Sequence, residues 1–109
     1  MRVMSRKRLA EFWKRFPDAQ TALLAWYKLA MKADWASLQD VRQYFPHGDG
    51  IELYCGLVVT VFNIRGNNYR LITRMIYPYR RIYIKAVLTH RQYDQDNWKA
   101  KLCREYTSD

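Results

Sequence analysis

The sequence predicts a single α+β domain, in which a helical hairpin packs on an antiparallel sheet of three or four strands and a last helix closes the chain. Two observations lead to this prediction. Apolar residues recur at helical spacing in the first third of the chain, and three later runs rich in β-branched and aromatic residues are separated by Gly, Asn or Pro. The 109 residues, half of them apolar, suffice for one core and are too few for two, so one domain is expected over 1–109.

Two amphipathic helices are expected first. Ser5 can cap a helix over 6–16 that Pro17 ends, and Asp18 can cap a second helix. Positions i, i+3, i+4 and i+7 are apolar in both helices: Leu9, Phe12, Trp13 and Phe16, then Leu23, Trp26, Tyr27 and Ala30. Together these helices form the hairpin that covers one face of the sheet.

A short third helix is expected to begin after Ser37, because Ser37 and Asp40 have the spacing of a capping box. It ends before Pro46, and the segment 47–50 has the composition of a loop.

The sheet is expected in the second half of the chain. Its three antiparallel strands cover 57–64, 69–76 and 82–88, and residues around Val3 could add an edge strand. Thr89 and Gln92 form another capping box, which begins the last helix.

Strand pairing turns this outline into a candidate site. A tight turn at residues 66–67 places Asn63 opposite Arg70, and the second turn then places Lys85 opposite Arg74. Arg70, Arg74 and Lys85 would form a cationic patch on the face away from the helical hairpin.

The charge of the chain favours a polyanionic partner. Nineteen Lys and Arg stand against ten Asp and Glu, for a net charge of +9, and from Leu53 to Tyr93 there are seven basic residues and no acidic one. Such a field of one sign attracts phosphate backbones. The alternative is a solvated basic face that only keeps the protein soluble.

Several classes of protein are not expected. The basic N-terminus lacks the apolar run of a secretory signal, and no stretch reaches the length of a membrane span, so we expect a cytoplasmic protein without a membrane partner. Cys55 and Cys103 lie far apart in the chain, and His47 and His90 are the only histidines. We therefore expect reduced thiols, no disulfide, no metal and no cofactor.

The predicted patch carries groups that RNA cleavage needs. Without a metal, the ribose 2′-hydroxyl must lose a proton, the phosphorane charge must be stabilised and the leaving 5′-oxygen must gain a proton. Arg70 and Lys85 are candidates for holding the phosphate, and His90 and Tyr93 for carrying protons. We expect nearby cations to lower the pKa of Tyr93 below about 10.

Each of these residues also has a purely structural interpretation. His90 could cap or pack, Tyr93 could be a core contact or stack on an unpaired base, and Arg70 or Arg74 could pair with an acid. The candidate acids are Glu11, Asp94 and Asp96.

The run 61–72, followed by Thr89-His90-x-x-Tyr93-Asp94, resembles the HigB toxins of the RelE-like superfamily. The likeness extends through shorter matches at 5–7, 11–13, 17–19, 25–28 and 33–35. The resemblance implies a metal-independent endoribonuclease that cuts messenger RNA, largely on the ribosome. It also implies a helix-turn-helix antitoxin (HigA-like) that neutralises the toxin, so that operator DNA is reached only through the antitoxin.

The family's arginine falls on Arg70, and its His and Tyr fall on His90 and Tyr93. The family commonly has Lys where this chain has Arg65, and Arg where it has Lys85; charge is kept at both, but Lys in place of Arg loses bidentate phosphate contacts, so the role of Lys85 is less direct. Contacts with RNA are expected from Arg65, Asn63, Asn67 and Arg74. Two other functions stay open: a non-catalytic module that binds RNA, DNA or a partner, and a basic face that docks an acidic protein.

Overall fold

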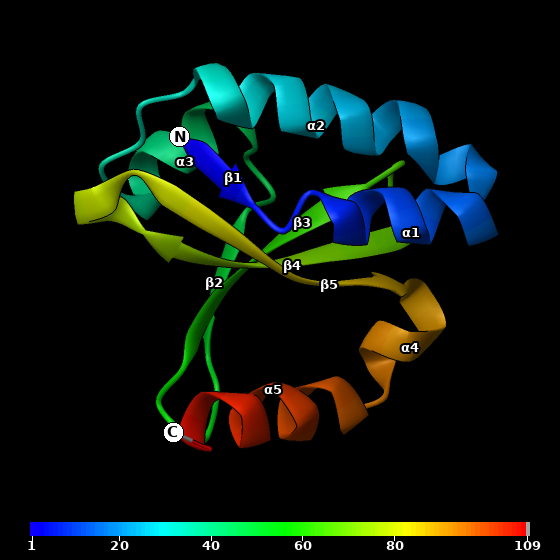
Figure 1. Ribbon diagram of the computed structural model, residues 1–109, viewed down its shortest axis with the longest axis vertical. Coiled ribbons are helices and arrows are strands. Elements are labelled where there is room, and N and C mark those ends of the chain that lie inside the picture. Colours follow the sequence, from blue (N-terminus) through cyan, green and yellow to red (C-terminus); the bar gives the residue numbers. More distant parts are fainter. Residues whose placement is uncertain (109) are drawn as a thin grey trace.

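The computed structural model describes residues 1–108 as a five-stranded sheet with helices on both faces (Figure 1). The strand order is β1-β5-β4-β3-β2. The strands are β1 (Arg2–Met4), β2 (Asp49–Glu52), β3 (Val58–Ile64), β4 (Tyr69–Ile76) and β5 (Arg81–Thr89). The helices are α1 (Lys7–Arg15), α2 (Gln20–Lys32), α3 (Leu38–Tyr44), α4 (His90–Asp94) and α5 (Asn97–Thr107). The predicted α+β class, with an N-terminal helical hairpin and a C-terminal helix, is confirmed.

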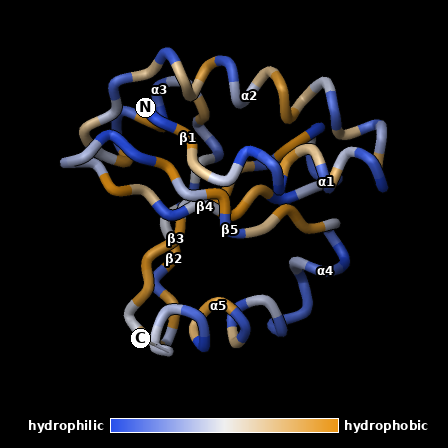
Figure 2. Tube along the Cα trace, in the orientation of Figure 1, coloured by the Kyte–Doolittle hydropathy of each residue, from blue (hydrophilic) through white to orange (hydrophobic). Residues whose placement is uncertain are grey.

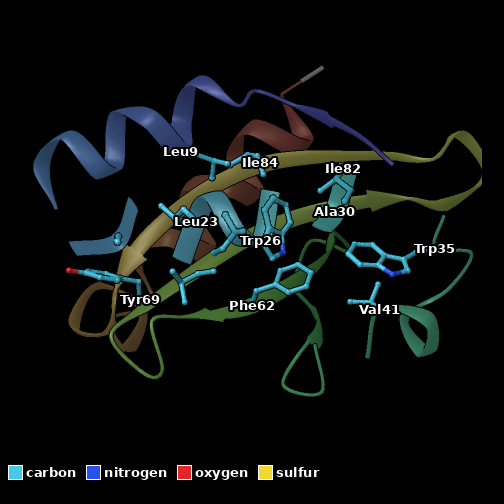
Figure 3. Close-up of a cluster of buried hydrophobic side chains, with 13 residues drawn as sticks. Leu9, Leu23, Trp26, Ala30, Trp35, Val41, Phe62, Tyr69, Ile82 and Ile84 are labelled. Atoms are coloured by element: carbon cyan, nitrogen blue, oxygen red, sulfur yellow. The ribbon is translucent and has the colours of Figure 1, made fainter. Parts of the chain in front are cut away.

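The main core lies between the sheet and the helices α1 and α2. Leu9 of α1 and Leu23 and Trp26 of α2 are almost fully buried, and the Trp26 ring lies edge-on to Phe62 of β3 at 5.4 Å between centroids (Figure 3). The helical spacing of these apolar residues therefore has the expected cause, which is burial against one face of the sheet.

A second core lies on the opposite face, beneath α5. Trp98 and Leu102 of α5 pack on Val59, Val61 and Ile72 of the sheet. Figure 2 shows hydrophobic colour along the strands between the two helical layers and hydrophilic colour on α4. The sequence predicted that this face of the sheet is polar. That prediction is wrong for the middle of β3 and β4, because strands that are apolar on both faces are buried on both faces.

Three local expectations fail for identifiable reasons. Ser5 has a positive φ of 68° and does not cap α1, and the N-cap of α2 is Ala19, without a side-chain hydrogen bond. Asp18 is instead bound by the guanidinium of Arg65 and the hydroxyl of Tyr69. Residues 49–52, expected as a loop in part, form the edge strand β2.

The capping box of Thr89 and Gln92 is complete, whereas at Ser37 only the N-cap bond forms, because the Asp40 carboxylate accepts from the Ala36 backbone N–H instead. The Ser37 hydroxyl accepts from the Asp40 backbone N–H, and the Thr89 hydroxyl accepts from that of Gln92. The edge strand at Val3 is also present, parallel to β5.

The pairing of β3 with β4 is as predicted, whereas that of β4 with β5 is not. Asn63 lies opposite Arg70, but Arg74 lies opposite Tyr83 rather than Lys85. The pairing shifts between Ile72 and Thr73, and Lys85 is the extra residue on β5 at this bulge. Lys85 nevertheless does not point into the core beneath the helical hairpin. Its side chain lines surface hollows instead.

The expectation of two reduced thiols is wrong, since Cys55 and Cys103 form a disulfide with Cα atoms 5.7 Å apart. The bond joins the segment before β3 to α5, which packs on the neighbouring sheet surface. A separation of 48 residues along the chain hid this pairing from the sequence. The disulfide fastens the helix that covers the second core.

Removal of this bond is expected to lower the free energy of unfolding by about 2–4 kcal/mol, because the cross-link restricts the unfolded chain. Urea unfolding of the wild-type protein with and without dithiothreitol measures the difference. In the control, a protein with both Cys55→Ala and Cys103→Ala, dithiothreitol should have no effect. Coincident curves for oxidised and reduced wild-type protein would show that the bond does not stabilise the fold.

Candidate functional site

A hollow of about 440 Å³ opens on the α5 side of the sheet. Its walls come from the end of α3 and the following loop, from β2, β3 and β4, and from α4. They comprise Arg42, Pro46, His47, Gly48, Asp49, Val61, Asn63, Arg70 and Tyr93. Three residues selected from the sequence, Asn63, Arg70 and Tyr93, therefore line one hollow.

Arg70 is the central charge of this hollow. Arg70 is only 9% exposed. Its guanidinium donates hydrogen bonds to the backbone oxygens of Asn67 at 3.1 Å and Tyr69 at 3.2 Å, and to the side-chain oxygen of Asn67 at 2.7 Å. None of the ion pairs between described residues includes Arg70. A buried cation that has hydrogen bonds but no counter-charge is ready to receive an anion.

Tyr93 fixes the other side of the Arg70 guanidinium. The Arg70 Cζ lies 5.3 Å from the centroid of the Tyr93 ring, and the ring itself stacks on Trp98 at 5.4 Å and 18°. The Trp98 indole N–H also donates to the backbone oxygen of Tyr93. The phenol is thus held between a cation and an aromatic ring, both of which restrict its orientation.

Burial raises the pKa of Tyr93, and the carboxylate of Asp49 raises it further, while Arg70 and Lys99 oppose the shift. The expectation of a lowered pKa is therefore wrong, because removal of water from the phenol outweighs the nearby cations. The phenol of Tyr93 keeps its proton at neutral pH and can donate it.

His90 lies at the start of α4, beside the turn that holds Arg70. Its backbone N–H donates to the Asn68 carbonyl at 2.9 Å, and its Nδ1 lies 2.9 Å from a carboxylate oxygen of Asp94. With Nδ1–H donated to Asp94, the Nε2 of the half-exposed ring is left to accept a proton. His90 does not line the hollow itself.

The turn between β3 and β4 connects these groups. Arg65 adopts a positive φ of 51° and pairs with Asp18 at 2.8 Å, so its charge is partly neutralised. Asn67 holds Arg70, and Asn68 holds the backbone of His90. One turn therefore places both the buried cation and the imidazole.

Arg74 and Lys85 lie elsewhere, so the predicted patch of three cations is divided. They line a separate hollow of about 380 Å³ together with Leu57, Glu105 and Tyr106. The Arg74 Cζ lies 5.1 Å from the centroid of the Tyr106 ring at the far end of α5. The helix α5 covers the sheet between the two hollows. Alternation along the strands carries no information about this helix, so it predicted one continuous patch.

Three ionisable residues of the Arg70 hollow were missed from the sequence: Arg42, His47 and Asp49. Arg42 and Asp49 face each other at 3.9 Å, and Asp49 pairs with Val61 across the β2–β3 ladder. Since β2 was read in part as a loop, nothing in the sequence placed these residues beside Arg70.

Neither a metal cluster nor a membrane span is found in the part of the chain that the structure covers. No three His, Cys, Asp or Glu side chains of residues 1–108 gather as metal ligands would. No helix in that range combines the length and the apolar character needed to cross a bilayer.

The architecture is consistent with the fold of RelE-like toxins, and comparison with known proteins identifies the family. The model of the HigB toxin family, described as the RelE-like toxic component of a toxin-antitoxin system, matches residues 19–96. This match covers well over half of the chain. The chain belongs to the HigB toxin family.

Similar proteins carry names that agree with this assignment. The mRNA interferase HigB of Escherichia coli O6:H1 is 24% identical over 95 residues, which cover 87% of this chain and 90% of that protein. The mRNA interferase toxin HigB of Escherichia coli K12 is 26% identical over 94 residues, which cover 86% and 88%. An mRNA interferase HigB of Shigella flexneri matches to the same extent.

Proposed function

We propose that this toxin is an endoribonuclease that cleaves messenger RNA without a metal, with the message presented by the ribosome. The names of its relatives support messenger RNA as the substrate. The observation that carries the proposal is the buried guanidinium of Arg70, which has no carboxylate partner among the described residues and lies over the Tyr93 ring. Such a fixed cation suits a phosphate that gains negative charge in the transition state.

The groups around Arg70 have the properties that strand cleavage by the ribose 2′-hydroxyl requires. His90, oriented by Asp94, accepts the proton of the 2′-hydroxyl at Nε2. The 2′-oxygen then bonds to phosphorus, Arg70 stabilises the phosphorane, and the bond to the 5′-oxygen breaks. Tyr93 donates its proton to that leaving oxygen, in agreement with the raised pKa of its phenol. The products are a 2′,3′-cyclic phosphate and a 5′-hydroxyl.

The remaining candidates contribute to binding in this proposal. Asn63 is exposed in the hollow and contacts the RNA directly, while Asn67 acts through Arg70. Arg65 contacts the RNA backbone, although its pair with Asp18 neutralises part of its charge. Arg74 and Lys85 bind RNA outside the hollow, so in this proposal Lys85 does not hold the reacting phosphate.

We further propose that a helix-turn-helix antitoxin of the HigA type neutralises the toxin, and that operator DNA is reached only through this partner. Membership in a toxin-antitoxin family supports an antitoxin. The place of action is the cytoplasm, where the translated message is found.

The chemistry predicts products that distinguish this reaction from metal-assisted hydrolysis. Toxin dialysed against a chelator and added to programmed ribosomes should cleave at an unchanged rate, because every proposed proton carrier is a side chain. End-labelling of the fragments should show 5′-hydroxyl ends. The control message carries a phosphorothioate at the cleaved linkage, and Mn²⁺ should not alter its rate of cleavage. Products with 5′-phosphate ends, or rescue by Mn²⁺, would contradict the proposal.

A further inference from the structure

We infer that this toxin has a second RNA-binding surface, separate from the Arg70 hollow, which holds a single-stranded segment flanking the cleaved one. This inference rests on the proposed function, because it assigns the path of the same substrate. The surface, called here the β4–β5 strip, consists of Arg74 on β4, Arg81, Tyr83 and Lys85 on β5, and Tyr79 in the connecting turn.

The strand pairing places these side chains on one face. Arg74 lies opposite Tyr83 and Ile76 lies opposite Arg81, while Lys85 follows Tyr83 at the alternate position. Together with Ile76, the five residues of the strip line a hollow of about 370 Å³. The strip is therefore a continuous surface of strand and turn residues.

The cations of the strip are not neutralised by acids. None of the ion pairs between described residues includes Arg74, Arg81 or Lys85. The neighbouring Arg80 differs, because its guanidinium pairs with Asp34 at 2.5 Å. Two carboxylates of the described residues line hollows with these cations: Glu105 with Arg74 and Lys85, and Glu11 with Lys85. The strip thus keeps an excess of positive charge, which a phosphate backbone would balance.

Exposed aromatic rings lie among these cations. Tyr79 is 73% exposed, and the Arg81 Cζ lies 5.9 Å from the centroid of its ring. Tyr106 is 39% exposed beneath Arg74. Exposed rings between cations are the arrangement on which unpaired bases stack while their phosphates are held electrostatically. This chemistry favours single-stranded RNA over a duplex, whose bases are already stacked.

The strip and the Arg70 hollow lie along the same pair of strands, β4 and β5, and a third hollow lies along β5 between them. Lys85 also lines a third hollow of about 420 Å³ with Lys101 of α5 and with Leu88, which is the pairing partner of Arg70. Arg70 and Arg81 are separated by about six strand positions, or roughly 20 Å at 3.3 Å per residue. An RNA bound at Arg70 and extended by several nucleotides can reach the strip by passing beside α5. This continuity is the reason to favour RNA over an acidic protein as the ligand.

Binding of RNAs of two lengths tests the inference. The probes are single-stranded 2′-O-methyl RNAs of about 6 and about 24 nucleotides, which cannot be cleaved, and the measurement is fluorescence anisotropy over a range of salt concentrations. We expect Arg81→Gln combined with Lys85→Gln to reduce the slope of log K against log salt by roughly 1.4 for the long RNA, at about 0.7 per phosphate contact. Tyr79→Ala should weaken its binding about tenfold. The short RNA should bind the variants and the wild-type protein equally.

Matched controls lie next to the strip and far from it. Arg80→Gln removes a charge that Asp34 already neutralises, and Tyr54→Ala removes a ring that is 80% exposed elsewhere; neither should change binding of the long RNA. Unchanged affinity of the strip variants for the long RNA, or equal weakening for both lengths, would overturn the inference. So would weakened antitoxin binding with RNA binding intact, since the strip would then dock a protein.

Cleavage assays separate this inference from the proposed nuclease activity. If the wild-type toxin fails to cut ribosome-bound message but the strip variants lose affinity for the long RNA, the nuclease proposal is wrong and the inference of RNA binding at the strip is supported. If the wild-type toxin cuts the message and the strip variants bind the long RNA normally, the inference about the strip is wrong and the nuclease proposal is supported.

Discussion

Replacement of Arg70 by Ala is expected to lower the rate of messenger RNA cleavage by about 10²–10³-fold, the usual cost of removing one preorganised group that stabilises transition-state charge. Arg70 is 9% exposed, and its guanidinium lacks a carboxylate partner among the described residues and is fixed by three hydrogen bonds to Asn67 and Tyr69. It therefore needs no reorganisation when the phosphorane forms. Single-turnover cleavage on programmed ribosomes measures the effect, and growth arrest on expression should be relieved in parallel.

Two further variants distinguish loss of chemistry from loss of structure. Arg70→Lys keeps the charge but loses the planar fork, so its rate should lie between those of the wild-type protein and the Ala variant. Lys28→Ala removes an exposed cation on α2, which packs on the other face of the sheet, and should leave cleavage unchanged. Thermal unfolding shows whether each variant is folded. A folded Ala variant that cuts at the wild-type rate would remove Arg70 from the reaction.

The sequence predicted those parts of the fold that depend on neighbouring residues. The helices α1 and α2 follow from apolar spacing, and the β3–β4 register follows from a tight turn that leaves little freedom in pairing. The predicted β4–β5 register was wrong because a bulge adds Lys85 to β5. The alternation of apolar and polar residues does not reveal an extra residue of this kind.

Contacts between distant segments were not predictable in the same way. The disulfide of α5 to Cys55 and the pair of Asp18 with Arg65 join residues that are 48 and 47 positions apart, and the packing of α5 on the outer face also joins distant segments. These contacts decided the outcome for the site. Asn63, Arg70 and Tyr93 line one hollow and His90 lies beside it, whereas α5 separates Arg74 and Lys85 from them.

Replacement of Tyr93 by Phe is expected to lower the rate of cleavage by about 10²–10⁴-fold, the range for loss of a positioned proton donor. Phe keeps the ring between Arg70 and Trp98 and removes only the hydroxyl, so the hollow should keep its shape. Tyr27→Phe is the matched control, because the Tyr27 ring on α2 also lies against an arginine, with the Arg6 Cζ 5.1 Å from its centroid, but lies outside the Arg70 hollow.

The pH dependence of this loss tests the direction of proton transfer. Burial raises the pKa of Tyr93 above its ordinary value of 10.0, so the donating form persists as pH rises and is lost only in more alkaline solution. The ratio of wild-type to Phe-variant rates should therefore be constant from about pH 6.5 to about pH 9. A phenolate acting as the base would instead make this ratio increase with pH, since more of the reactive form would be present at each step. A ratio that increases with pH would assign Tyr93 to the 2′-hydroxyl and leave the 5′-oxygen to His90.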